Sequence, residues 1–269
     1  MPDLPEVTSP NRFKQAIARG QRVVGMWSAL ASPIVAEILS GTGFDWIVID
    51  GEHAPNDIPS LLGQLQAMRG STAEPVFRVP WNDMVIIKRA LDVGARTLIV
   101  PFVQNAEEAG RAAAATLYPP RGVRGVAVAV RASDFGRVPN YLTNAHQDTC
   151  LLVQLETRAA LKEIEAIAKV DGVDGLFIGP SDLAADMGHL GNPAHTDVQA
   201  AVRDAAARIR AAGKPAGTLV RTVEDAERMF EWGFTFVAAG IDVAILGRNA
   251  EALAEKLRKS APRYSSSSN

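Results

Sequence analysis

Eight short apolar segments alternate with longer segments of helical spacing along the chain, and this alternation constrains the fold more than any other feature. The strand-like segments are rich in β-branched and aromatic residues; they are Val23–Ser28, Trp46–Asp50, Pro75–Val79, Thr97–Phe102, Cys150–Glu156, Gly175–Gly179, Pro215–Val220 and Phe234–Gly240. Ala-, Leu- and charge-rich segments between them predict helices, for instance at 58–69, 84–93, 106–117, 159–170, 198–212 and 223–232.

The predicted strands are nearly continuous apolar runs, which is typical of a parallel sheet covered by helices. Such units build either an open doubly wound sheet or a closed (β/α)8 barrel. Eight evenly spaced strands without a linker favour the barrel, and a length of 269 residues suits it. We therefore expect one α/β barrel domain over residues 1–262, followed by a polar, disordered tail at 263–269.

Composition excludes several classes of partner. The net charge is −2 and the basic residues are scattered, so no nucleic acid or anionic membrane is an expected partner. No apolar stretch approaches the roughly 20 residues that cross a bilayer, and the N-terminus has no signal-peptide pattern; we expect a cytoplasmic protein. The single cysteine, Cys150, opens an apolar run and is interpreted as a buried thiol rather than a nucleophile.

Two segments interrupt the alternation, at residues 118–149 and 185–193. Long loops inside a compact domain are usually lids or interface segments. We expect one of these roles for each.

The carboxyl ends of the predicted strands carry most of the candidate polar residues, and a (β/α)8 barrel has its site at these ends. In chain order these positions carry Trp27, then Asp50, Glu52 and His53, then Arg78, Pro101, Gln154 with Glu156, Ser181 with Asp182, Leu219 and Asp242. Polar chemistry from at least five strands predicts a functional site rather than ordinary surface.

Two of these carboxylates suit a divalent cation. Gln154 and Glu156 are two residues apart and share one strand face, and Glu156 and Asp182 come from adjacent strands. Oxygen ligands of this kind suit Mg²⁺ or Mn²⁺. Alternatively, Glu156 pairs with Arg158, and Ser181 or Asp182 merely caps a helix. The residues alone leave both interpretations open.

The positions of the lysines and histidines limit which catalytic mechanisms are expected. Every lysine lies on a predicted helix or in a turn, so a Schiff-base mechanism is not expected and carbonyl chemistry would need a metal. His146, His189 and His195 lie in the polar interruptions and are interpreted as solvated loop residues. His53 follows a strand and is the candidate general base. We interpret Asp50 and Glu52 as groups that hold its imidazole, and Asn56-Asp57 as a helix start.

The motifs "FDWIVIDGEHAPND", "FRVPWND", "KRALDVGARTLIVPFVQNAEEA", "YPPRGVRG", "LLVQLETR", "VDGLFIGPSDLAADMGHLGNP" and "FVAAGIDVAIL" occur in this order. From about Gly25 to the C-terminal helix, the chain resembles the HpcH/HpaI aldolases. These are class II, metal-dependent pyruvate aldolases that cleave 4-hydroxy-2-oxo acids. The resemblance implies a reversible retro-aldol reaction giving pyruvate or hydroxypyruvate and an aldehyde.

The resemblance also implies ligands. Glu156 and Asp182 would hold a divalent metal, Mg²⁺ or Mn²⁺ with Co²⁺ or Zn²⁺ as alternatives. Gln154 and the backbone around Ser181 would position the pyruvate carboxylate.

Three further residues take implied catalytic roles. His53 would accept the proton, Arg78 would stabilise the oxyanion and enolate, and Asp92 would raise the basicity of His53. Asp92 lies near the end of a predicted helix, where a carboxylate normally faces solvent at the far end of a barrel. The resemblance further implies hexamers that exchange their last helix.

The sequence does not select the aldehyde. Trp27, Leu219 and Val220 at strand ends suggest a roomy substrate pocket with broad acceptance. Two other functions remain as alternatives: a carbon–carbon lyase acting on acyl-CoA esters of the malyl- or citramalyl-CoA type, and a non-catalytic barrel that binds a partner.

Overall fold

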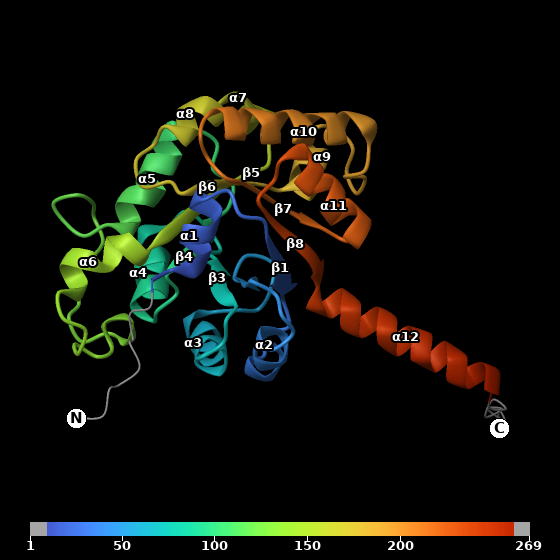
Figure 1. Cartoon of the computed structure of the whole chain (residues 1–269), viewed down its shortest axis with the longest axis horizontal. Coiled ribbons are helices and arrows are strands. Elements are labelled where there is room, and N and C mark those ends of the chain that lie inside the picture. Colours follow the sequence, from blue (N-terminus) through green and yellow to red (C-terminus); the bar gives the residue numbers. More distant parts are fainter. Residues whose placement is uncertain (1–9, 261–269) are drawn as a thin grey trace, which may run out of the picture.

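Eight parallel strands form a closed barrel in which each strand bonds to the next and β8 bonds to β1 (Figure 1). This computed structural model describes residues 10–260, so the tail predicted at 263–269 lies outside it. The strands are β1 Val23–Ser28, β2 Trp46–Asp50, β3 Glu74–Arg78, β4 Thr97–Val100, β5 Cys150–Leu155, β6 Gly175–Ile178, β7 Ala216–Val220 and β8 Phe236–Ile241. The predicted (β/α)8 barrel is confirmed.

Most helices follow a strand and pack around the barrel (Figure 1). They are α1 Arg12–Ala18, α2 Pro33–Ser40, α3 Ile58–Ala67, α4 Met84–Asp92, α5 Ala106–Thr116, α6 Tyr141–Asp148, α7 Arg158–Lys162, α8 Ile164–Ala168, α9 Pro180–Asp186, α10 Thr196–Ala211, α11 Val223–Trp232 and α12 Asp242–Ser260. The helix predicted at 159–170 is divided at Glu163 into α7 and α8. The interruption at 118–149 is partly helical, because it contains a 3-10 turn at Arg131–Ser133 and α6.

One strand begins earlier than its apolar pattern suggests. β3 includes the buried Glu74, whose carboxylate pairs with Arg96 at 2.9 Å and accepts a hydrogen bond from the Thr97 hydroxyl at 3.0 Å. A carboxylate with such partners can lie in a buried strand, which a purely apolar pattern does not predict.

Aromatic side chains fill the barrel interior. Trp46 and Phe236 lie 6.0 Å apart, and Phe13 of α1 reaches them at 5.4 and 5.7 Å between ring centroids. A Cβ at Gly217 would come within 1.9 Å of the Phe236 ring, so only glycine leaves space for that ring. The first helix thereby closes the amino end of the barrel.

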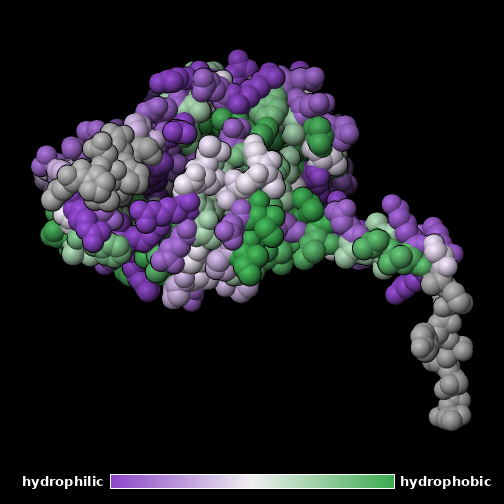
Figure 2. All heavy atoms as spheres, turned by 60° about the horizontal axis from the view of Figure 1, so that its bottom comes forward, coloured by the Kyte–Doolittle hydropathy of each residue, from purple (hydrophilic) through white to green (hydrophobic). Residues whose placement is uncertain are grey.

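The C-terminal helix α12 extends away from the barrel (Figure 1). Its exposed apolar residues are Val243, Ile245, Leu246, Leu253 and Leu257. Figure 2 shows apolar surface where this helix leaves the barrel and again along the helix. None of the helices within residues 10–260 is long and apolar enough to cross a membrane.

Cys150 is fully buried at the start of β5, as predicted, and burial raises the pKa of its thiol well above the usual value. A thiol that stays protonated is a poor nucleophile.

Candidate active site

Arg78 is the centre of a buried charged cluster at the carboxyl ends of β1, β2 and β3. In the parallel register Asp50 lies beside Arg78, and its carboxylate accepts two hydrogen bonds from the guanidinium, at 2.8 and 2.6 Å. Glu52 lies 2.8 Å from the third guanidinium nitrogen. Trp27 donates its indole N–H to Asp50 at 3.1 Å, and the guanidinium lies 4.8 Å from the Trp27 ring centroid. These contacts fix the direction of Arg78, while a five-donor guanidinium still retains N–H groups for a ligand.

His53 lies at the open side of this cluster. Its side chain is 64% exposed, and Nε2 lies 3.7 Å from a carboxylate oxygen of Glu52. The backbone N–H groups of Glu52 and His53 donate to Asp50 at 3.0 and 3.4 Å. Asp50 therefore orders the turn, whereas Glu52 is the carboxylate near the imidazole.

Glu156 follows β5 and is buried among donors. One carboxylate oxygen accepts the backbone N–H of Phe102 at 2.8 Å, and the other accepts the Gln154 amide N–H at 2.6 Å. The carbonyl oxygen of Gln154 is buried without a hydrogen-bond partner among the described residues. A Cβ on Gly179 would lie 2.6 Å from Glu156 Oε2, so the β6 end approaches this carboxylate closely.

The three carboxylates Glu52, Glu156 and Asp182 influence one another. Burial and the charges of Glu52 and Asp182 together raise the pKa of Glu156 to about 7, against the lowering effect of the hydrogen bonds from Gln154 and Phe102. Burial also raises the pKa of Glu52, with Asp50 and Asp182 adding to the increase and Arg78 opposing it. A divalent cation would offset this concentration of negative charge, so the residues fit the group that the family resemblance implies.

The structure differs from the alternative interpretation, in which Glu156 pairs with Arg158 and Ser181 or Asp182 caps a helix. Arg158 pairs with Asp186 at 3.1 Å rather than with Glu156. The N-cap of α9 is Gly179, and no side chain within residues 10–260 caps that helix. Ser181 and Asp182 therefore lie exposed in the first turn of α9 without a capping role. This leaves the Asp182 carboxylate free for a ligand near Glu156.

Two of the three apolar residues expected in the substrate pocket, Trp27 and Leu219, differ in position. Trp27 is buried, and its contacts place it beneath Arg78. Leu219 is half-buried at the end of β7 and packs against the aromatic residues of the barrel interior. Asp242, another strand-end residue, accepts hydrogen bonds from Ser28 and from the backbone of Ala29 and Leu30, which ties β8 to the end of β1.

Asp92 is separated from the strand-end cluster. It is the last residue of α4 and pairs with the buried Arg124 at 2.8 Å. Since a barrel helix runs antiparallel to its strand, the end of α4 lies toward the amino ends of the strands. None of the interactions described for His53 involves Asp92.

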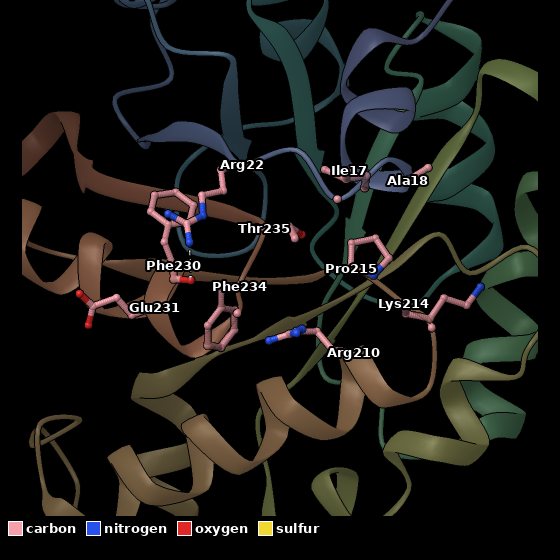
Figure 3. Close-up of a pocket in the computed structure, with 13 residues that line it drawn as sticks. Ile17, Ala18, Arg22, Arg210, Lys214, Pro215, Phe230, Glu231, Phe234 and Thr235 are labelled. Carbon is pink, nitrogen blue, oxygen red and sulfur yellow. Dashed lines mark hydrogen bonds between the residues drawn. The ribbon is translucent and has the colours of Figure 1, made fainter.

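A cavity of about 500 Å³ lies at the opposite end of the barrel. Its wall comes from segments that precede β1, β7 and β8, including Arg22, Lys214 and Thr235 (Figure 3). It contains none of the predicted site residues, so the candidate site is the strand-end cluster.

Sequence reasoning missed two residues of this site. Phe102 has a φ of 55°, and this left-handed conformation accompanies the N–H contact to Glu156. No sequence signal indicates it, because left-handed backbone usually requires glycine. Gly179 was recognisable as a strand stop before Pro180, but its close approach to Glu156 depends on the β5–β6 register.

The sequence of the barrel matches that of a known protein family. Residues 23–248 match the HpcH/HpaI aldolase/citrate lyase family, across all eight strands. The chain belongs to the HpcH/HpaI aldolase/citrate lyase family. The predicted family is thereby confirmed, and this HpcH/HpaI protein is a carbon–carbon lyase of the aldolase type.

Two relatives are similar to this HpcH/HpaI protein over nearly their whole length. A 4-hydroxy-2-oxo-heptane-1,7-dioate aldolase of Klebsiella pneumoniae is 54% identical over 252 residues, covering 93% of this chain and 95% of the relative. A 5-keto-4-deoxy-D-glucarate aldolase of Salmonella arizonae is 51% identical over 250 residues, covering 93% and 98%. A crystal structure of a family protein from Burkholderia cenocepacia superposes with a TM-score of 0.89 at 38% identity, covering 92% and 99%.

Proposed function

We propose that the chain catalyses the divalent-metal-dependent retro-aldol cleavage of 4-hydroxy-2-oxo diacids to pyruvate and an aldehyde. The observation that carries the proposal is the group of three mutually repelling carboxylates, Glu52, Glu156 and Asp182, at the carboxyl end of the barrel, where Glu52 also contacts Arg78 at 2.8 Å. Two relatives at 51% and 54% identity, named for 5-keto-4-deoxyglucarate and 4-hydroxy-2-oxoheptanedioate, support this substrate class.

Glu156 and Asp182 would hold the cation, and Mg²⁺ or Mn²⁺ suits their oxygen ligands better than a softer ion. When bound, the cation would act as a Lewis acid toward the 2-oxo acid. The backbone N–H at Ser181 would orient the substrate carboxylate, and the free carbonyl oxygen of Gln154 would accept a hydrogen bond from water beside it.

The chain's own residues would move the proton and receive the developing charge. Removal of the C4 hydroxyl proton turns that carbon into the aldehyde carbonyl as the C3–C4 bond breaks, leaving its electron pair in the enolate of pyruvate. His53, exposed beside Glu52, would accept the proton. Arg78, held by Asp50 and Glu52, would direct its remaining N–H groups at the enolate oxygen. Protonation at C3 then completes pyruvate. The role of Asp92 toward His53 stays a prediction; within its own chain its carboxylate pairs with Arg124.

Acyl-CoA esters are a less well supported substrate class. The Klebsiella pneumoniae and Salmonella arizonae relatives are named for oxo-diacid substrates without a CoA group. A requirement for CoA in turnover would favour the alternative.

We also propose that the protein is a homo-oligomer, a hexamer in which α12 is exchanged between subunits. The support is the apolar surface of α12, which extends from the barrel with Leu246, Leu253 and Leu257 exposed. An exposed apolar helix face is suited to packing on another copy.

The proposed function predicts that the Arg78→Ala and Arg78→Lys variants cleave 4-hydroxy-2-oxoheptanedioate slowly. Loss of a donor aimed at developing charge typically lowers kcat about 10²–10³-fold, and lysine cannot reproduce the two-point contact with Asp50. Pyruvate release would be measured by a coupled assay, with and without a chelator, and Mn²⁺ content would be measured in each variant.

Glu165→Gln is the matched control, because Glu165 is an exposed carboxylate paired with Arg208 at the surface. Arg78→Ala leaves the buried Asp50 without its cation, so the Arg78→Lys variant and a melting curve separate catalysis from folding. Near-wild-type turnover by folded Arg78→Lys, or cleavage unaffected by the chelator, would contradict the proposal.

A further inference from the structure

The loop between α9 and α10 brings His189, His195 and Asp197 together. Their candidate ligand atoms all lie within 4.8 Å of one another, and no other group of three or more His, Cys, Asp or Glu residues in the part of the chain described does so. From the sequence, we interpret both histidines as solvated loop residues. Instead, their rings stack with centroids 3.5 Å apart and an interplanar angle of 14°.

Backbone hydrogen bonds hold this loop in shape. The N–H of His189 donates to Ala184 at 2.7 Å, that of Asn192 donates to His189 at 2.9 Å, and that of His195 donates to Asn192 at 3.1 Å. Gly188 and Gly191 turn the chain with φ values of 84° and 77°. The two imidazoles therefore lie beside α10 before any ligand arrives.

The distances are close to those of a three-ligand metal site. His189 Nε2 and His195 Nδ1 each lie 3.7 Å from the same oxygen of Asp197, Oδ2. Ligand atoms of a tetrahedral Zn²⁺ site, with bonds of about 2.0–2.1 Å, lie about 3.3 Å apart. For all three atoms to bind one ion, the stacked rings would turn out of their parallel arrangement, because an imidazole nitrogen binds a metal in the plane of its own ring.

His195 Nδ1 is a hydrogen-bond acceptor in this loop, and a metal ion also needs an unprotonated nitrogen. The backbone N–H of Asp197 donates to His195 Nδ1 at 3.2 Å, so this nitrogen carries a lone pair rather than a proton. A cation bound at Nδ1 would replace that hydrogen bond. The half-buried rings and the exposed Asp197 leave the remaining coordination positions open to water.

The ligand set selects a different ion from that of the strand-end site. Imidazole nitrogen suits Zn²⁺, Ni²⁺, Co²⁺ and Cu²⁺, whereas Mg²⁺ and Mn²⁺ prefer oxygen. We propose that His189, His195 and Asp197 bind a borderline transition-metal ion of the Zn²⁺ type at a second metal site. This ion links the end of the α9 loop to the first turn of α10, at the opposite end of α9 from Asp182.

The test uses Zn²⁺ as the probe and the full chain in calorimetric titration. Wild type is expected to bind Zn²⁺ at two classes of site, and Glu156→Gln to retain only the histidine class. His189→Ala and His195→Asn, each made in Glu156→Gln, are expected to bind Zn²⁺ at least about tenfold more weakly, because each lacks one ligand. His195→Asn keeps a side-chain acceptor at the N-cap of α10, so α10 should remain folded.

His146→Ala in the same background is the matched control, because His146 lies on α6 and outside the cluster. Unchanged Zn²⁺ affinity and stoichiometry in both loop variants would overturn the second site. That outcome leaves the proposed aldolase function intact, whereas a chelator-insensitive reaction would overturn the function and leave this site standing.

Discussion

Two buried carboxylates of the candidate site, Asp50 and Glu156, have pKa values shifted in opposite directions. Burial raises the pKa of Asp50, but the hydrogen bonds and charge of Arg78 outweigh burial and lower it below its usual value. Glu156 is equally buried but receives only neutral donors, and its pKa rises to about 7. Asp50 is therefore a permanent partner of Arg78, whereas Glu156 is able to bind either a proton or a cation.

The pKa of Glu156 predicts that Mn²⁺ affinity rises with pH. The carboxyl group is neutral below about pH 7 and charged above it, and only the charged form binds a cation, so affinity should fall about tenfold per pH unit on the acid side. Calorimetry over about pH 6 to about pH 8 measures this slope, within the range where a raised carboxyl titrates. Glu156→Gln should bind weakly at every pH, and a flat wild-type profile would contradict the assignment.

The same shift has a consequence for stability, since the folded pKa lies above the usual 4.5. The contribution of Glu156 to the free energy of unfolding is fully present below about pH 4.5 and is lost as the pH rises through about 7. Added Mn²⁺ should restore that loss at neutral pH, which thermal melting would record.

Gly179→Ala should disturb the site without a change of charge. The new Cβ would lie 2.6 Å from Glu156 Oε2 and 2.9 Å from Gln154 Nε2, closer than carbon packs against these atoms. We expect kcat/KM and Mn²⁺ affinity to fall at least about tenfold, because even small misplacements of reacting groups are costly.

Gly110→Ala in α5 is the control for this substitution, since its Cβ would meet no atom within 4 Å. Alanine favours helix over glycine, so this control should be neutral or slightly stabilising. Equal activity of the Gly179 and Gly110 variants would show that the strand end moves to admit the methyl group.

Individual elements follow the apolar periodicity closely, with two differences. β3 begins at Glu74 because Arg96 and Thr97 satisfy its carboxylate. The segment 159–170 forms α7 and α8, with the chain interrupted at Glu163. The start of β3 depends on polar partners that a pattern of apolar residues does not contain.

Leu253→Glu combined with Leu257→Glu on α12 should weaken subunit association. Both side chains are exposed in the single chain, and burial of a leucine contributes about 1.5–3 kcal/mol at an interface. The mass of the particle in solution, measured by light scattering across a dilution series, should fall toward that of one chain. Glu251→Gln on the exposed polar surface of the same helix is the control, and an unchanged mass in the double variant would exclude this face from the interface.

The closed barrel depends on side chains from distant segments meeting at its centre. Phe13 from α1 contacts Trp46 from β2 and Phe236 from β8, although these residues are far apart in sequence. The amino end of the barrel is therefore closed by an element that precedes the first strand.

Phe13→Ala should destabilise the whole molecule by about 3–5 kcal/mol, because it leaves a cavity at a buried aromatic contact. The free energy of unfolding would be measured by denaturant titration. Phe135→Ala, at a side chain that is 61% exposed, should change stability by less than about 0.5 kcal/mol. Similar losses in the two variants would contradict the proposed closure.

The sequence by itself determined the barrel, its eight strands, and the polar strand ends that carry Arg78, Glu156 and Asp182, because periodicity and strand length are local properties. Its motifs also indicated the family that the comparisons confirm. Only the tertiary structure decided which groups meet: Asp50 with Arg78 through the β2–β3 register, Phe102 with Glu156, Asp92 with Arg124, and His189 with His195. Such pairings depend on strand register and loop path, which are set by the packing of the whole chain rather than by neighbouring residues.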